Sequence, residues 1–316
     1  MYFYVFFIKI QKYRFSYCQK YGFMVIYKKR KTGRCELKNK AKATASLIAV
    51  AMLCHMLLHM ASSYLVGNLH GAVKLFVSIL LTILRLGIPI LIISFGARRL
   101  SFGDYSCRAS FSYPEYFSVF SASFTVIFLF GLAYSLIFPS ETVSFSGTSL
   151  ERILSAVLLI AVPAVMEEYL IRRLIAGKLA VYNQSAAIII SALIFALMHY
   201  SAEKFPYTFV CGLILGATYL KTGSFVLVMA VHFANNLATY AFGVLSEFCT
   251  ARICNIVTLV FAAFCLATTA AMAPKLICAM KKDTAPAENE SGATELLSPA
   301  LILYMAVAML RQLVFM

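Results

Sequence analysis

The stretch PAVMEEYLIRR, residues 163–173, lies in the middle of a long apolar run and decides how the rest of the chain is interpreted. It places two adjacent carboxylates and two adjacent guanidinium groups among flanking Leu, Ile and Val residues. Each ionisable side chain within a membrane helix costs about 2.5 to 3.5 kcal/mol on insertion scales, so four of them in one segment indicate a use. The stretch therefore predicts a membrane-spanning helix that carries a functional site.

The composition predicts a polytopic membrane protein. Of the 316 residues, 61% are hydrophobic and only 13% are charged, and the mean hydropathy is +0.83. An average soluble domain has about 25% charged residues. At about 20 residues for each crossing, we expect an all-α bundle of about eight transmembrane helices, two of them short, with the active site inside the bundle. The predicted spans are residues 45–65, 73–95, 117–138, 153–175, 186–199, 207–220, 225–245 and 256–272.

Three segments are expected along the chain. Residues 1–44 form a basic, aromatic segment on the cytoplasmic side, with the alternative that translation starts later, for instance at Met24. Residues 45–280 form the transmembrane domain, whose motif core is residues 150–245. Residues 281–316 comprise a polar linker, expected to be disordered, and a short apolar segment that is interrupted by Arg311 and is expected to lie on the membrane surface.

The distribution of charge predicts the orientation. Twelve Lys or Arg residues lie between Lys9 and Lys42 against the single acid Glu36. Such a basic segment beside a first span is held in the cytoplasm, and the later loops favour both termini there. Orientation and anionic lipid headgroups account for the net charge of +15, so no nucleic-acid partner is expected. A prokaryotic plasma membrane is the predicted location, with the endoplasmic reticulum as the alternative.

Several polar features outside the central stretch are assigned structural roles. The nine cysteines are scattered without a CxxC pair, which argues against a disulfide framework or a cysteine metal site. His55 and His59 share one helical face, but no third metal ligand is obvious, so they are interpreted as interior or interfacial histidines. Arg85, near the middle of the second span, needs an acidic or carbonyl partner and is a candidate counter-charge for the carboxylates.

The two carboxylates differ in their predicted surroundings. Residues four apart share a helical face, so Glu168 lies over Arg172 while Glu167 points about 100 degrees away. Glu167 is thus left without a partner on its own face, as a general base requires. Pro163 cannot donate to the carbonyl of Leu159, so it should bend the helix one turn earlier and open room for water.

Two more polar islands follow in the second half of the chain. FALMHY, residues 195–200, puts His199 near the end of the fifth span, and HFANN, residues 232–236, puts His232 and Asn236 one turn apart in the seventh. Each alone is typical of interhelical contacts. Together with Glu167 they offer a carboxylate, two imidazoles and an amide from three helices, which suffice to activate water and to stabilise an oxyanion.

The three islands carry a resemblance to a known family. Residues 167–172 match an EExxxR pattern, residues 195–199 an FxxxH pattern and residues 232–236 an HxxxN pattern. In order and approximate spacing they resemble the CAAX proteases and bacteriocin-processing enzymes, a family of intramembrane endopeptidases. The motifs cover less than a third of the chain.

The resemblance implies a set of roles. Glu167 would activate water with His199 as its partner, His232 and Asn236 would stabilise the oxyanion, and Glu168 and Arg172 would support them. It also implies a metal-free glutamate mechanism. The alternative is a zinc site formed by Glu167, His199 and His232, with water in the fourth position. The expected partners are membrane lipids and a peptide or lipidated protein substrate, CAAX-like or bacteriocin-like.

Two rival functions and one discrepancy remain open at this stage. A relative with the same fold could act only by binding, as an immunity protein, and a proton-coupled transporter would also place carboxylates and histidines in spans. If the fourth span runs inward, Glu167 lies on the cytoplasmic side of its midpoint while His199 lies at the outer end of the fifth span, so their depths differ by roughly 14 Å. Either the fourth helix extends farther than predicted, the fifth continues past His199, or a helix is broken.

Overall fold

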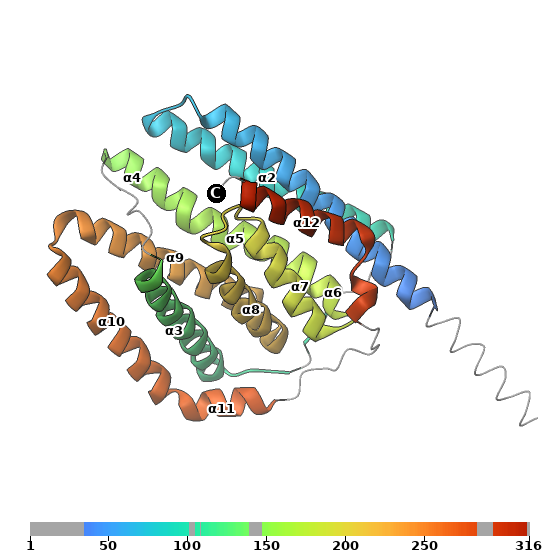
Figure 1. Ribbon diagram of the computed structural model, residues 1–316. Helices are drawn as coiled ribbons and strands as arrows, with labels where there is room; N and C mark the ends of the chain where they lie inside the picture. The colour runs from blue at the N-terminus through green and yellow to red at the C-terminus, as the bar shows by residue number, and fades with distance from the viewer. Residues whose placement is uncertain (1–34, 101–104, 108, 139–146, 283–292, 315–316) are drawn as a thin grey trace, which may run out of the picture.

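The computed structural model describes residues 35–100, 105–107, 109–138, 147–282 and 293–314, and these are helical with short connections (Figure 1). The predicted basic, aromatic segment falls mostly at residues 1–34 and most of the predicted linker at residues 283–292, outside the described ranges. The elements in chain order are the helix Cys35–Val66, α2 (Gly71–Arg99), α3 (Tyr113–Ile137), α4 (Ser149–Ala156), the π-helical η1 (Val157–Ala161), α5 (Val162–Glu168), the π-helical η2 (Tyr169–Ala176), α6 (Gly177–Ala180), α7 (Gln184–Leu197), α8 (Phe205–Thr222), α9 (Phe225–Phe248), α10 (Ala251–Ala271), α11 (Ala273–Lys281), the 3-10 helix η3 (Ala293–Leu296) and α12 (Pro299–Val314).

Six of these helices are long and apolar enough to cross a membrane, which confirms the prediction of a polytopic all-α membrane protein. They are Cys35–Val66, α2, α3, the continuous helix Ser149–Ala180, α9 and α10. The two spans predicted to be short correspond to α7 and α8. Large apolar side chains such as Leu84, Leu259 and Phe264 are more than half exposed on the long helices, as expected for surfaces that face lipid.

The arrangement in Figure 1 places the motif-bearing helices between two outer groups. The helix Cys35–Val66 lies beside α2 on one side of the molecule, and α10 and α11 lie on the other side, next to α3. The first helix begins at Cys35, nine residues before the end of the segment predicted to precede the membrane domain. The helices α7, α8 and α9 lie in the interior of this arrangement.

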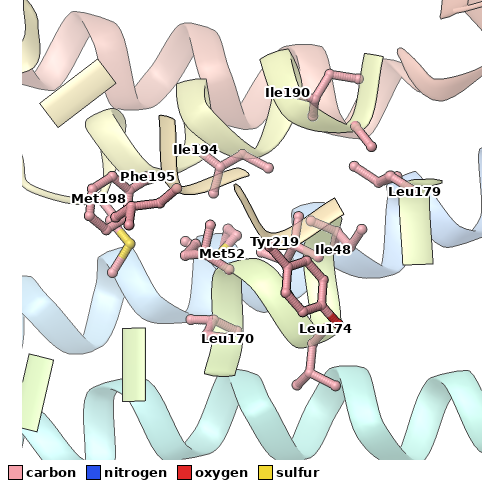
Figure 2. Packing of buried hydrophobic residues seen from close by; sticks show 14 of the residues in the cluster. Ile48, Met52, Leu170, Leu174, Leu179, Ile190, Ile194, Phe195, Met198 and Tyr219 are labelled. Carbon is pink, nitrogen blue, oxygen red and sulfur yellow. The ribbon is translucent and has the colours of Figure 1, made fainter. Parts of the chain in front are cut away.

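The core is formed where the first helix meets η2 and α7 (Figure 2). Ile48 and Met52 of the first helix are fully buried against Leu170 of η2 and Ile194 of α7. Moving a side chain of this size from water into a protein core contributes about 1.5 to 3 kcal/mol. Between helices that already lie in lipid, the stabilisation comes mainly from close van der Waals contact. This core fixes the helix that carries the two carboxylates.

The helices α7 and α8 form a closely packed hairpin. Gly212 and Gly216 lie four apart on α8, and a Cβ atom at Gly212 would come within 2.9 Å of the Cα atom of Ala192 on α7. Small residues at this spacing let two membrane helices approach closely. The hairpin is short, because α7 has only 14 residues, and its turn carries His199.

The structure brings together two residues that the predicted spans had placed at different depths, because His199 lies within electrostatic range of Glu167. The chain turns back after α7, which ends at Leu197, and enters α8 at Phe205. The fourth helix also extends farther than predicted, over Ser149–Ala180 rather than residues 153–175. His199 consequently lies at the tip of the hairpin, next to His232, which is the eighth residue of α9.

The C-terminal helix α12 packs against α7. Its buried residues Leu301, Tyr304, Ala308 and Gln312 follow a helical spacing of three or four, and Leu310 and Leu313 on other faces are exposed. The prediction that this segment lies on the membrane surface is not tested by the structure, but one face of the helix belongs to the bundle.

Candidate active site

The helix Ser149–Ala180 is interrupted by two π-helical segments, one on each side of the carboxylates. The first, η1, ends just before Pro163, and the second, η2, begins just after Glu168. Because residue 163 is proline, the Leu159 carbonyl lacks its usual amide donor, and it accepts a hydrogen bond from Asn236 Nδ2 at 3.1 Å. The predicted interruption at Pro163 thus takes the form of a π turn, a feature often found at functional sites.

Glu168 is the centre of a buried ion cluster. Its Oε2 accepts from Nε of Arg172 at 2.9 Å, and its Oε1 lies 2.9 Å from Nδ1 of His232. The side chains of Glu168 and Arg172 are fully buried. The predicted contact between Glu168 and Arg172 is present, and the contact to His232 joins the first motif to the third. The Nδ1 atom of His232 donates to a carboxylate, so its Nε2 is left to contact other groups.

Phe195 organises the cationic and imidazole groups around its ring. The guanidinium carbon of Arg172 lies 4.9 Å from the ring centroid, a distance favourable for a cation–π interaction. The rings of His199 and His232 contact the same phenyl ring edge to face, with centroids 4.9 and 5.9 Å away. The first residue of the second motif therefore packs against residues of all three motifs.

His199 is held in one orientation by its own helix. Its Nδ1 lies 2.7 Å from the carbonyl oxygen of Phe195, and because a carbonyl only accepts, Nδ1 carries the proton and donates. The Nε2 atom of the neutral ring is then an acceptor. An imidazole fixed in this way can receive a proton or orient a water molecule.

Glu167 is buried but has a different set of neighbours. Glu167 is 7% exposed. Among the described residues, no hydrogen bond or ion pair joins its carboxylate to another side chain. It lies close enough to Arg85, His199 and His232 to interact with each electrostatically. Arg85, the candidate counter-charge, is thus within electrostatic range of Glu167 without forming an ion pair among the described contacts.

A cavity of about 70 Å³ adjoins these residues. It has room for a few water molecules. The side chains that line it include His199, His232 and Asn236, together with the polar residues Tyr207, Thr208 and Asn235. Tyr207 donates to Oδ1 of Asn235 at 3.2 Å. The second and third motifs thus face one small, partly polar space, while Glu167 lies outside its lining.

The zinc alternative, formed by Glu167, His199 and His232, and the metal-free alternative both stay predictions. Within the described ranges, no group of three or more His, Cys, Asp or Glu residues is arranged to hold a metal ion. One imidazole nitrogen of His232 is already used by Glu168, and one of His199 by the Phe195 carbonyl.

Sequence reasoning did not connect Tyr200, Arg311 or Gln312 with the site. Tyr200 contacts His55, and Arg311 contacts both Tyr200 and His59. A usable signal was present, because Arg311 and Gln312 are polar residues in an apolar segment and such groups need partners. The partners of His55 and His59 are thus side chains of the bundle, Tyr200 and Arg311.

Comparison with known proteins gives one match. Residues 149–238 match the family model described as type II CAAX prenyl endopeptidase Rce1-like. A search of curated proteins and a search of solved structures found no match. The matched segment covers less than a third of the chain and contains all three motifs, and it confirms the resemblance to the CAAX protease family at the level of the family.

Proposed function

We propose that the chain, a multi-pass membrane protein with a type II CAAX endopeptidase segment at residues 149–238, hydrolyses a peptide bond in a membrane-associated or lipidated substrate through a glutamate-activated water. The observation that carries the proposal is the convergence of three motifs from three helices beside one cavity, through the contact between Glu168 and His232. Ionisable and polar residues from three helices rarely meet inside a membrane bundle without a function.

In this mechanism Glu167 is the general base. As a carboxylate free of hydrogen bonds among the described residues, it can accept a proton from a water molecule, and the Nε2 atom of His199 orients that water. The water oxygen attacks the peptide carbonyl carbon and forms a tetrahedral oxyanion. The proton taken by Glu167 then passes to the leaving nitrogen, and the carbon–nitrogen bond breaks.

Two residues are assigned to the oxyanion. His232 is oriented by Glu168, and its Nε2 donates to the oxyanion when both ring nitrogens carry a proton. Asn236 has two N–H donors, of which one contacts the Leu159 carbonyl, so the second is available. Glu168 and Arg172 hold the first motif and His232 in place and take no part in proton transfer.

The test is cleavage of a panel of fluorogenic, lipid-modified peptides by the purified protein and by Glu167→Gln. Gln retains the size of the side chain but cannot act as a base, so we expect about 10³-fold lower kcat with unchanged folding. Glu203→Gln is the matched control, because it removes an exposed carboxylate in the turn that follows His199.

A strong zinc chelator, added to both proteins, separates the two mechanisms. Activity that resists the chelator and is lost in Glu167→Gln supports the glutamate mechanism. Activity abolished by the chelator and restored by zinc would replace it with the metal-dependent alternative. The wild type and Glu167→Gln could both fold and bind the same partner while the wild type cleaves no peptide. In that case the peptidase proposal fails, and the alternative of a non-catalytic binding protein stands.

A further inference from the structure

The turn that carries His199 is completed by a side chain of the C-terminal helix α12. Gln312 is buried and donates through Nε2 to the carbonyl oxygens of Ala196 and Leu197, at 3.4 and 3.3 Å. These carbonyls belong to the last turn of α7, where intrahelical donors run out. The backbone N–H groups of His199 and Tyr200 approach the same two oxygens at 3.3 and 3.2 Å.

The residue after His199 has a strained backbone. Tyr200 has a φ of 52°, and it is the one non-glycine residue with positive φ in the part of the chain that the structure describes. The left-handed conformation costs a residue with a Cβ atom about 1 to 2 kcal/mol. Such strain persists where the surroundings determine the conformation, and it is often found beside active sites.

The surroundings of Tyr200 come from both ends of the chain. Its hydroxyl lies 2.9 Å from Nδ1 of His55 on the first helix, and the Arg311 guanidinium lies over its ring, 4.1 Å from the centroid. Arg311 also contacts Nδ1 of His59 at 3.0 Å. Because arginine has no acceptor, His59 accepts there with a neutral ring. Tyr200 is therefore held by contacts to the first helix and to α12.

From these contacts we propose that α12 positions His199, with Gln312 and Arg311 as positioning residues for the site. Neither residue is among those that line the cavity, so both act through the turn. The inference rests on the proposed function, in which the Nε2 atom of His199 orients the attacking water. Loss of the contacts made by Gln312 and Arg311 would let the turn relax and move the imidazole of His199. A misplacement of about 1 Å can lower a rate about 10²-fold.

The polar character of Gln312 argues for positioning rather than packing alone. Leu301, Tyr304 and Ala308 already bury the same face of α12. A buried amide is costly unless its donors are used, and an apolar side chain of equal size would pack at lower cost. Both hydrogen bonds recorded for Gln312 go to the turn that carries His199.

The experiment compares Gln312→Met with the wild type and with Leu310→Met. Met keeps the volume of Gln but removes both donors, and Leu310 lies on the exposed face of the same helical turn. We expect kcat to fall about 10- to 100-fold in Gln312→Met, with KM within about twofold and an unchanged thermal midpoint. Hydrogen–deuterium exchange at residues 195–201 should rise in Gln312→Met only.

A second pair of variants tests Arg311. Arg311→Lys retains a cation above the Tyr200 ring, so it should retain more activity than Arg311→Met. The positioning role is overturned if exchange at residues 195–201 is the same in Gln312→Met as in the wild type, or if kcat falls equally in Leu310→Met. If the wild type proves to have no peptidase activity, the exchange measurement still decides whether α12 holds the turn, and the proposed function alone is lost.

Discussion

Two neighbouring carboxylates on one helix have opposite surroundings. Glu168 is fully buried and is paired with Arg172 and His232 at 2.9 Å each. Glu167 is 7% exposed, and among the described residues it has electrostatic neighbours but no hydrogen bond. Burial alone therefore does not distinguish Glu167, the carboxylate proposed as the base, from Glu168, the carboxylate proposed to be structural. The difference is whether every charge-bearing oxygen already has a partner.

The largest effect is expected when the partners of Glu168 lose its carboxylate. Glu168→Ala leaves Arg172 buried without its carboxylate and His232 without its acceptor, so we expect a loss of about 3 to 5 kcal/mol in the free energy of unfolding. The double variant Glu168→Ala, Arg172→Met should lose less than the single variant, since no buried charge is orphaned. Denaturation in detergent measures both, with Glu203→Ala as the control. A Glu168→Ala protein as stable as the wild type would show that the cluster does not support the fold.

Asn236 sharpens the comparison, because it has a structural contact to the Leu159 carbonyl and a proposed role in catalysis. Asn236→Ala removes the donor to the Leu159 carbonyl, which should cost about 1 kcal/mol of stability, and it should lower kcat about 10²-fold through loss of an oxyanion donor. Asn235→Ala is the matched control, because Asn235 lines the same cavity and contacts Tyr207. Equal losses of kcat in the two variants would remove Asn236 from the oxyanion site.

The smallest effect is expected for a partly exposed ion pair outside the site. Lys38 contacts Glu295 at 2.5 Å, and this hydrogen bond lowers the pKa of Glu295 below its usual value. A lowered carboxyl pKa stabilises the folded form at neutral pH, and the contribution is lost as the pH falls through the pKa of the folded form. A spin label at Thr294 should become more mobile toward pH 3 in the wild type but show no such pH dependence in Glu295→Gln. Equal pH dependence in both proteins would contradict the assignment.

Hydropathy predicted the helices well but not how far each one crosses. The six long helices follow from runs of about 20 apolar residues, the length that a bilayer requires. An apolar run of 14 residues, such as α7, has the same composition whether it crosses a membrane or turns back inside a bundle. The close contact of Gly212 with Ala192 that makes the hairpin possible depends on tertiary packing. For this reason the sequence could not show that His199 lies within electrostatic range of Glu167.

The contacts within the site were predictable only where they are local. The pair of Glu168 and Arg172 follows from helical spacing, and the unpaired Leu159 carbonyl follows from Pro163. The partner of that carbonyl, Asn236, lies 77 residues away, and the choice of Glu168 over Glu167 by His232 depends on how α9 is rotated. The roles of Glu167, His199, His232 and Asn236 in catalysis stay predictions until the variants are measured.

The length of α7 also sets how the protein meets the lipid bilayer. Its 14 residues rise about 21 Å, which is about 9 Å less than the hydrocarbon thickness of about 30 Å, so α7 is too short to cross a bilayer of that thickness. His199 lies at the tip of the hairpin, and the distance from bulk water to the site is shortest there if the bilayer thins locally. A shallow, wettable depression over the hairpin would supply hydrolytic water without a pore through the whole membrane.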